Sequence, residues 1–129
     1  MDILANVLTH IRNASAVKKP SCLVRHSRIT EEVLKLIKRE GYISDFKIEE
    51  KGIKKNIRVF LSYDTKGEPV IHSIKRISKP GRRIYSPAEK IRSVLGGVGT
   101  MIISTNKGML TGKEAKAESI GGEVVCEIY

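Results

Sequence analysis

Hydrophobic spacing in the first half of the chain changes repeatedly between two periods, and this alternation limits the folds that the chain can adopt. Residues 3–11 place apolar side chains three or four positions apart, as a helix does, whereas residues 21–25 alternate apolar and polar side chains, as a strand does. A second helical pattern covers residues 30–40, and alternating segments cover residues 43–50 and 53–62. The order helix, strand, helix, strand, strand predicts an α/β sandwich with helices packed on a small sheet.

Capping and turn residues set the expected ends of these segments. Asp2 and Thr30 carry side chains that cap helix N-termini, and Gly41 is typical of the position just beyond a helix. Residues 12–13, arginine and asparagine, follow the first apolar stripe and predict the end of that helix. Residues 50–52 end in glycine and predict a hairpin between the last two strands.

The second half has shorter segments, which predict a mostly β domain with short helices. Extended chain is expected at residues 70–78, 84–85, 101–103 and 124–129. The run Ser86-Pro87-Ala88-Glu89 predicts a helix that ends at Gly96-Gly97, because serine caps, proline suits the first turn and glutamate completes a capping box. Thr111-Gly112-Lys113-Glu114 predicts a second short helix for the same reason.

The polar, turn-rich residues 63–69 mark the expected boundary between the two halves. We therefore predict an α+β protein of two small domains. Residues 1–66 form the N-terminal α/β domain, and residues 67–129 form a mostly β C-terminal domain.

Charge indicates the kind of partner. The 129 residues include 24 Lys and Arg against 14 Asp and Glu, a net charge of +10 with a pI near 9.8. Domains this basic usually bind polyanions, of which nucleic acid is the commonest, and an anionic membrane surface or an acidic protein is the alternative. No apolar run approaches the roughly 20 residues of a spanning helix, and the N-terminus has no signal or lipidation pattern. We expect a cytoplasmic protein that does not bind membranes.

The two cysteines do not indicate a metal site. Cys22 and Cys126 lie far apart in the sequence, outside any C-x-x-C pair and within apolar, strand-like segments. A thiol in such a setting behaves as a small hydrophobic side chain. We expect both to fill the core without a disulfide or a metal.

Catalytic patterns are not recognisable either. His10, His26 and His72 are scattered, without a nucleophile or acid in a known order. The glycines of residues 96–99 follow a helical pattern and precede a strand, the reverse of a dinucleotide-binding loop, and lack the Lys-Ser/Thr of a P-loop. We predict no enzyme activity, cofactor or small-molecule substrate, with a small RNA-directed enzyme as the rival interpretation.

The candidate site is the stretch that follows the apolar run at residues 101–103. Short hydrogen-bonding side chains, a cation and a glycine come together in Ser104, Thr105, Asn106, Lys107 and Gly108. Such a turn at a strand end suits contacts with base edges and riboses, while Lys107 faces phosphate. An ordinary polar turn is the alternative.

A basic block adds to this candidate. Between residues 75 and 92 there are seven cations and one acid, and an aromatic residue, Tyr85, lies among them. A ring in a basic patch can stack on an unpaired base, and we expect Lys79, Arg82 and Arg83 to contact phosphates. A solvated surface is the alternative. A second basic set, Lys51, Lys54, Lys55 and Arg58, is expected to be a plain solvated edge strand.

Several segments in order along the chain resemble the bacterial small-subunit ribosomal protein eight family. They are Ile11-Arg12-Asn13-Ala14, Glu40-Gly41-Tyr42-Ile43, residues 77–85, Ser104-Thr105-Asn106-Lys107-Gly108 and Gly121-Gly122-Glu123-Val124. The resemblance implies a two-domain protein that binds the central domain of small-subunit ribosomal RNA early in assembly, beside neighbouring ribosomal proteins. It implies that the C-terminal domain, residues 67–129, is the RNA-binding domain and carries most of the RNA contacts. It also implies repression of the protein's own operon messenger.

The same resemblance assigns residues of the site. The family's Ser-Thr-x-x-Gly loop falls on Ser104, Thr105 and Gly108, and its aromatic residue after Pro-Gly falls on Tyr85. The supporting Gly-Gly-Glu falls on Gly121, Gly122 and Glu123, with the glutamate expected to accept hydrogen bonds that fix the loop. One departure is Asn106, where the family often has serine.

Overall fold

The computed structural model describes residues 2–129, which divide into two compact units. The N-terminal unit is Ile3–His72, and the C-terminal unit is Ser73–Tyr129 together with Asp2. The secondary structure confirms the predicted α+β class, with the helices of one unit on a sheet and a mostly β second unit.

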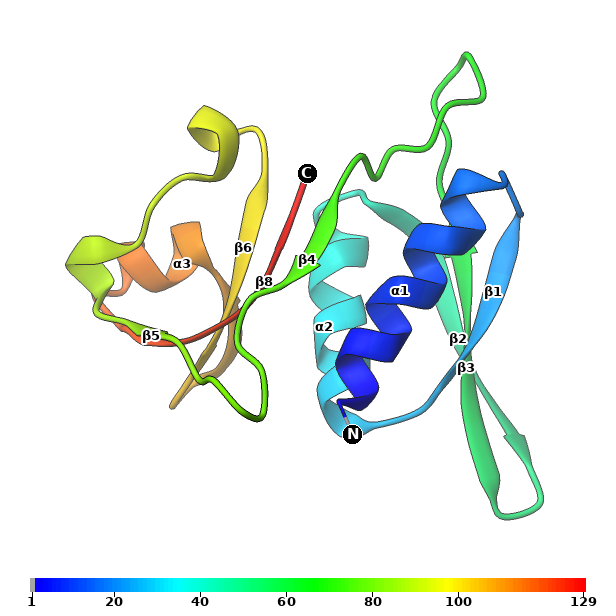
Figure 1. The fold of residues 1–129 in the computed structure, drawn as a ribbon, viewed down its shortest axis with the longest axis horizontal. Helices are drawn as coiled ribbons and strands as arrows, with labels where there is room; N and C mark the ends of the chain where they lie inside the picture. The colour runs from blue at the N-terminus through cyan, green and yellow to red at the C-terminus, as the bar shows by residue number, and fades with distance from the viewer. Residues whose placement is uncertain (1) are drawn as a thin grey trace. The chain divides into compact units, whose positions relative to one another are not determined.

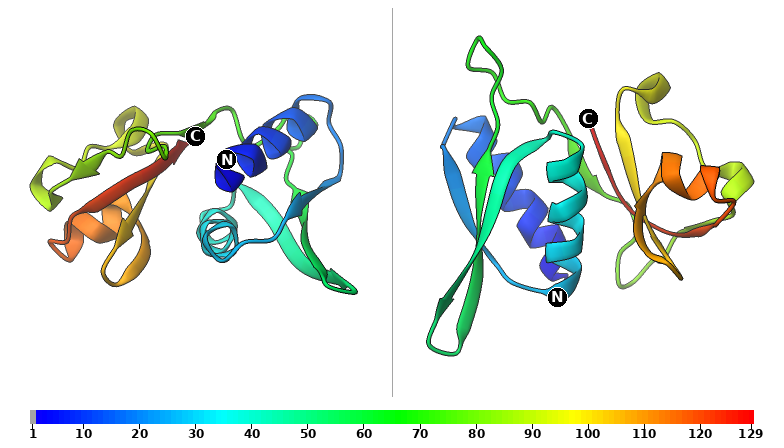
Figure 2. Two further views of the ribbon diagram at one scale, coloured as in Figure 1. Left: turned by 60° about the horizontal axis from the view of Figure 1, so that its bottom comes forward. Right: turned by 180° about the vertical axis from the view of Figure 1, so that it is seen from behind.

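The N-terminal unit follows the predicted order of elements. Its helices are α1 (Ile3–Ala16) and α2 (Arg28–Arg39), and its strands are β1 (Ser21–Arg25), β2 (Ile43–Lys51) and β3 (Lys54–Leu61). The strands form an antiparallel sheet in the order β1-β3-β2. Both helices lie on one side of this sheet (Figures 1 and 2), and the other side carries no helix of this unit.

The core of this unit explains why only one face of the sheet is covered. Helix α1 buries Leu8 and Ile11, α2 buries Leu34, and the middle strand buries Ile57 and Val59, all at 1% exposure or less. Alternation along β3 sends its odd-numbered residues toward the helices. Its even-numbered residues therefore face away from them.

Two predicted helix ends in this unit are wrong. Helix α1 does not end at residues 12–13 but continues to Ala16, because Ala14 and Ser15 are small enough to be buried against the unit's core. Thr30 is not a cap: the N-cap of α2 is Ser27, whose Oγ accepts a hydrogen bond from the backbone N–H of Thr30. Gly41 follows the C-cap of α2 with φ +85°, as predicted.

The second basic set does not lie on an edge strand as predicted. Lys54, Lys55 and Arg58 belong to β3, which is the middle strand, whereas Lys51 ends the edge strand β2. A hairpin turn at Gly52 joins β2 to β3, as predicted.

The C-terminal unit is built around its last strand. Its strands are β4 (Ile74–Arg76), β5 (Tyr85–Ser86), β6 (Thr100–Thr105), β7 (Gly108–Thr111) and β8 (Gly122–Ile128). The sheet order is β4-β8-β6-β7, and β5 also pairs with β8. Every pairing is antiparallel. Strand β8 pairs with three other strands, β4, β5 and β6 (Figure 1).

One predicted helix of this unit forms and the other does not. Helix α3 (Gly112–Ala117) has the predicted capping box between Thr111 and Glu114. The helix predicted over residues 86–97 is wrong: the chain makes two short 3₁₀ turns, η1 (Ala88–Lys90) and η2 (Val94–Gly97). Ser86 Oγ donates to the carbonyl of Pro87 and caps nothing.

Among the described residues, no helix is both long and apolar enough to cross a membrane. Both cysteines are free thiols. Cys126 is fully buried in β8, and burial raises its pKa to about 12. Cys22 is only half-buried.

Candidate nucleic-acid interface

Glu123 forms the centre of a row that crosses three strands of the C-terminal sheet. The register pairs Glu123 of β8 with Tyr85 of β5 on one side and with Ser104 of β6 on the other. Residues that pair directly in an antiparallel sheet project to the same face. Three of the predicted residues, distant in sequence, therefore lie side by side.

The Glu123 carboxylate is held by hydrogen bonds from two residues. Ser78 Oγ donates to Oε2 at 2.6 Å, and Arg83 Nη1 donates to the same oxygen at 3.0 Å. Ser78 is fully buried and also accepts from the backbone N–H of Ile84 at 3.0 Å. Burial alone would raise the pKa of Glu123, but these hydrogen bonds and the charges of Arg83 and Arg76 lower it below its usual value. The carboxylate therefore stays ionised and fixes the chain on both sides of the residue 79–82 turn.

That turn presents two cations to solvent. Lys79 and Arg82 exchange backbone hydrogen bonds of 3.0 and 2.9 Å across Pro80-Gly81. The side chains of Lys79 and Arg82 make no ion pair among the described residues, whereas Arg83 returns to Glu123. Lys79 and Arg82 are thus available to an anionic ligand.

The turn between β6 and β7 is shorter than predicted. Ser104 and Thr105 are the last residues of β6, and only Asn106 and Lys107 form the turn before Gly108, which has φ +99°. Thr105 Oγ1 donates to the carbonyl of Gly108 at 2.8 Å and accepts from the backbone N–H of Lys107 at 3.1 Å. The Thr105 hydroxyl therefore shapes the turn from within.

Two glycines allow the backbones of neighbouring segments to approach each other closely at this site. A Cβ on Gly121 would lie 2.5 Å from the carbonyl oxygen of Ser86, and a Cβ on Gly122 would lie 2.1 Å from that of Ser104. Real Cβ atoms do not tolerate such distances, so both positions need glycine. Gly121 and Gly122 thereby hold the β5 and β6 sides of the row against β8.

The row rests on a small apolar cluster. Ile91, Ile103 and Ala115 are buried together, with Met101 and Leu110 packed against them. The pairing of β6 with β8 shifts register between Ile102 and Ile103, just before Ser104. Helix α3 thus packs beneath the strand that ends in the candidate loop.

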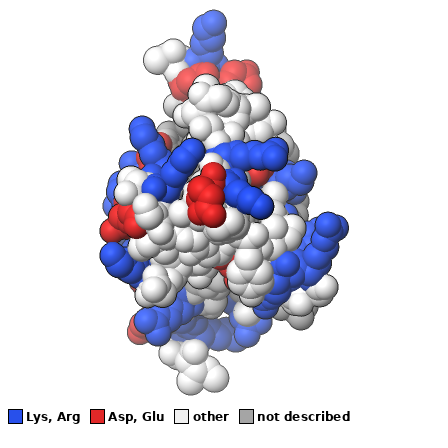
Figure 3. All heavy atoms as spheres, turned by 90° about the vertical axis from the view of Figure 1, so that its left-hand side faces the viewer, with Lys and Arg blue, Asp and Glu red and all other residues white. Residues whose placement is uncertain are grey.

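Charge and exposure set the chemistry of this surface. Tyr85 is 68% exposed, although apolar rings are usually covered. Lys107 Nζ lies 3.6 Å from Glu118 Oε1, a weak contact between exposed side chains. Figure 3 views the C-terminal unit from the left of Figure 1 and shows Lys and Arg side chains around a mainly uncharged surface with a few acids. Such a surface can bind phosphates and still offer polar groups and a ring to bases.

Comparison with known proteins identifies the family. The profile described as Ribosomal protein S8 matches residues 2–129. The chain belongs to the ribosomal protein S8 family.

Individual relatives agree over nearly their full length. The chain is 46% identical over 128 residues to "Small ribosomal subunit protein uS8" of Nautilia profundicola, covering 99% of this chain and 98% of the relative. It is 41% identical over 129 residues to the protein of the same name from Crocosphaera subtropica, covering 99% and 97%. The resemblance inferred from the sequence is confirmed. Ribosomal protein S8 is a structural protein of the small ribosomal subunit and not an enzyme.

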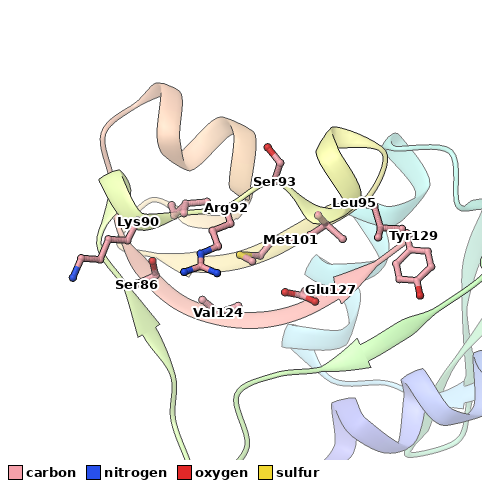
Figure 4. Close-up of a pocket in the computed structure, with 11 residues that line it drawn as sticks. Ser86, Lys90, Arg92, Ser93, Leu95, Met101, Val124, Glu127 and Tyr129 are labelled. Carbon is pink, nitrogen blue, oxygen red and sulfur yellow. The ribbon is translucent and has the colours of Figure 1, made fainter.

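Some residues of this S8 chain that form the site were not predicted. Ser78 donates a hydrogen bond to Glu123, and Glu118 lies near Lys107. Ser78 lies within the matched segment 77–85 but was given no role, and Glu118 belongs to no motif in the sequence. Lys90 and Arg92, from the predicted basic block, instead line a separate pocket of about 340 Å³ with residues of η2, β6 and β8 (Figure 4). Among residues 2–129, no cluster of three or more His, Cys, Asp or Glu could hold a metal ion.

Proposed function

We propose that this S8 chain binds small-subunit ribosomal RNA through its C-terminal unit and that this binding helps the RNA's central domain to assemble. The Tyr85–Glu123–Ser104 row is the observation that carries the proposal. Around it, an exposed ring, a strand-end hydroxyl and exposed cations converge on one sheet, held by the hydrogen-bonded carboxylate of Glu123. Family membership supports a ribosomal setting for this surface.

The residues divide into groups that position the RNA and groups that read it. Lys79, Arg82 and Arg83, with Lys107, neutralise phosphates, which fixes the protein's position without reading sequence. Ser104 and Asn106 contact bases and riboses, and Tyr85 stacks on a base or packs against a sugar. Thr105 acts through the turn, since its hydroxyl bonds to Gly108 and Lys107. Because side chains read regular RNA helices poorly, the target is a distorted site.

The family resemblance supports two further partners. A segment of the operon messenger that folds like the ribosomal site would occupy the same surface, so the two RNAs would compete. Neighbouring small-subunit proteins would contact parts of the chain that the RNA leaves exposed. Liposome flotation against RNA competition tests the alternative of a membrane-binding or acidic-protein-binding module.

Variants of Thr105 test the proposal directly. The Thr105→Ala variant loses both turn hydrogen bonds and should bind small-subunit ribosomal RNA about 10-fold more weakly, which corresponds to roughly 1.4 kcal/mol. Binding to an unrelated RNA of equal length should hardly change, and Thr105→Ser should retain the wild-type affinity. Footprinting with wild-type protein should protect nucleotides of the central domain. Equal losses on both RNAs, or protection elsewhere, would count against the proposal.

A further inference from the structure

The face of the N-terminal sheet that the helices leave uncovered carries an unusual distribution of charge. Even-numbered residues of β3 project to this face, together with their partners on β1 and β2. We call it the open face; its members from the two hairpin strands and β1 are Ser21, Leu23, Arg25, Asp45, Lys47, Glu49, Lys51, Lys54, Asn56, Arg58 and Phe60. Five of these are cations and two are acids.

Most of the open-face cations form no ion pair among residues 2–129. Arg58 Nε lies 2.9 Å from Glu49 Oε2 and so pairs with one of the two acids of the set. The other acid, Asp45, lies beside the bulge in β2 and forms an ion pair of 2.9 Å with Lys38 of α2. The remaining cations, Arg25, Lys47, Lys51 and Lys54, make no ion pair among residues 2–129.

Two cross-strand pairs on the open face join like charges. Lys47 stands opposite Arg58, and Lys51 stands opposite Lys54 at the end of the hairpin. Like charges directly opposite one another destabilise a sheet. On the reverse side of the same hairpin, Glu50 stands opposite Lys55, with Nζ 3.9 Å from Oε1. The hairpin therefore has complementary charges on one side and repelling charges on the open face, and an external polyanion would relieve that repulsion.

The hairpin tip adds an exposed apolar group. Gly52, at φ +65°, opens a two-residue turn whose second residue is Ile53, at 103% exposure. Turns of this kind are usually polar, and an isoleucine here packs on nothing in its own unit. The minor groove of an RNA helix is wide and shallow, and it offers sugar surfaces between two rows of phosphates. The hairpin tip is complementary to this groove, because the apolar Ile53 lies between the cations Lys51 and Lys54 as the sugar surface lies between the phosphates.

We infer that the open face is a second RNA-contacting surface, which holds the backbone of a double-stranded RNA segment without reading its sequence. It is separate from the Tyr85–Glu123–Ser104 row and lies in the other unit. The inference depends on the proposed function only for the choice of RNA used as a probe.

A matched pair of double variants tests this surface in the full-length chain. The test measures the affinity for a full-length small-subunit ribosomal RNA transcript as salt is varied. Loss of two phosphate contacts in Lys51→Gln/Lys54→Gln should reduce the slope of log affinity against log salt by about 1.4 to 1.8. The control, Lys35→Gln/Lys66→Gln, removes the same charge from exposed positions off the open face of the same unit and should leave the slope unchanged. Equal reductions in both variants, or none in either, would overturn the inference.

Two further readouts separate binding from structure. Without RNA, Lys51→Gln/Lys54→Gln should unfold at the wild-type temperature or slightly above it, because a repelling pair has been removed. A clearly lower unfolding temperature would assign these lysines a structural role and overturn the inference. A photo-crosslinking benzophenone residue at position 53 in reconstituted small subunits should crosslink to RNA, and crosslinks to an acidic protein alone would contradict it. The Thr105→Ala variant, measured in parallel, tests the C-terminal surface. The proposed function and this inference can therefore be refuted independently of each other.

Discussion

A Cβ on Gly122 would lie 2.1 Å from the carbonyl oxygen of Ser104, on the neighbouring strand of the C-terminal sheet. The closest atoms belong to backbone, which cannot move aside as the end of a flexible side chain can. Gly122, which precedes Glu123 in β8, therefore determines how closely the candidate loop approaches the rest of the row.

We expect Gly122→Ala to damage both stability and RNA binding. Overpacking should cost about 1 to 3 kcal/mol of unfolding free energy, and displacement of Ser104 should weaken binding to small-subunit ribosomal RNA. Denaturant unfolding and equilibrium binding measure the two effects. Gly81→Ala is the matched control, since its Cβ would meet nothing within 4 Å and its φ is not positive. If both variants behave like the wild type, the packing described at Gly122 is wrong.

The ionised carboxylate of Glu123 should make stability depend on pH. Its pKa is lowered in the folded protein, so its contribution is fully present above the unfolded value of about 4.3 and is lost as the pH falls through the lower folded value. Hydrogen bonds to a charged group contribute about 1.5 to 3 kcal/mol each. Glu123→Gln should therefore be less stable than the wild type at pH 7.

The difference in unfolding free energy between Glu123→Gln and the wild type separates the contribution of Glu123 from that of the other carboxylates. Urea unfolding at pH 7 and at intervals down to pH 3 should show the difference shrinking as the pH falls below about 4.3. A difference that stays constant over this range would show that the charge of Glu123 is not what holds Ser78 and Arg83.

Local sequence patterns predicted the elements whose hydrogen bonds lie close along the chain. The capping box at Thr111 and Glu114 and the helix terminator Gly41 involve residues within one helical turn, and both features are observed. Ser27 and Thr30 are both good caps by residue type, so propensity could not choose between them. Packing decides: Thr30 is fully buried and Ser27 is not.

Contacts between distant segments could not be predicted in this way. The Ser86-Pro87 start signal suggested a helix, but Gly121 brings β8 against Ser86 and Ile91 is drawn into the apolar cluster, so the chain cannot coil continuously. Strand β7 was missed because its four residues begin with Gly108 and show no clear alternation. The Ser78–Glu123 bond spans 45 residues, and nothing near Ser78 in the sequence indicates it.

The capping box at Thr111 should stabilise the helix that supports the candidate loop. Thr111→Ala removes the acceptor of the Glu114 N–H and should cost about 0.5 to 2 kcal/mol of unfolding free energy. Thr111→Ser keeps that acceptor and should lose much less. Thermal unfolding of both variants measures this, and equal losses would show that the methyl group of this buried residue matters more than its hydroxyl.

Arg82 and Arg83 are adjacent in sequence but should respond differently to removal. Arg82 makes no ion pair among the described residues, whereas Arg83 Nη1 donates to Glu123 Oε2 at 3.0 Å. Arg82→Ala should therefore leave folding stability unchanged and reduce the salt slope of RNA affinity by about 0.7 to 0.9, as expected for one phosphate contact.

Arg83→Ala should instead reduce stability as well as affinity, because Glu123 loses one of its two side-chain donors. Titrations of small-subunit ribosomal RNA at several salt concentrations, paired with thermal unfolding of each variant, separate the two residues. Lys66→Ala, an exposed cation in the other unit, provides the control for general loss of charge. If Arg82→Ala left the slope unchanged, Arg82 would not contact phosphate; if Arg83→Ala unfolded like the wild type, its bond to Glu123 would contribute nothing to the fold.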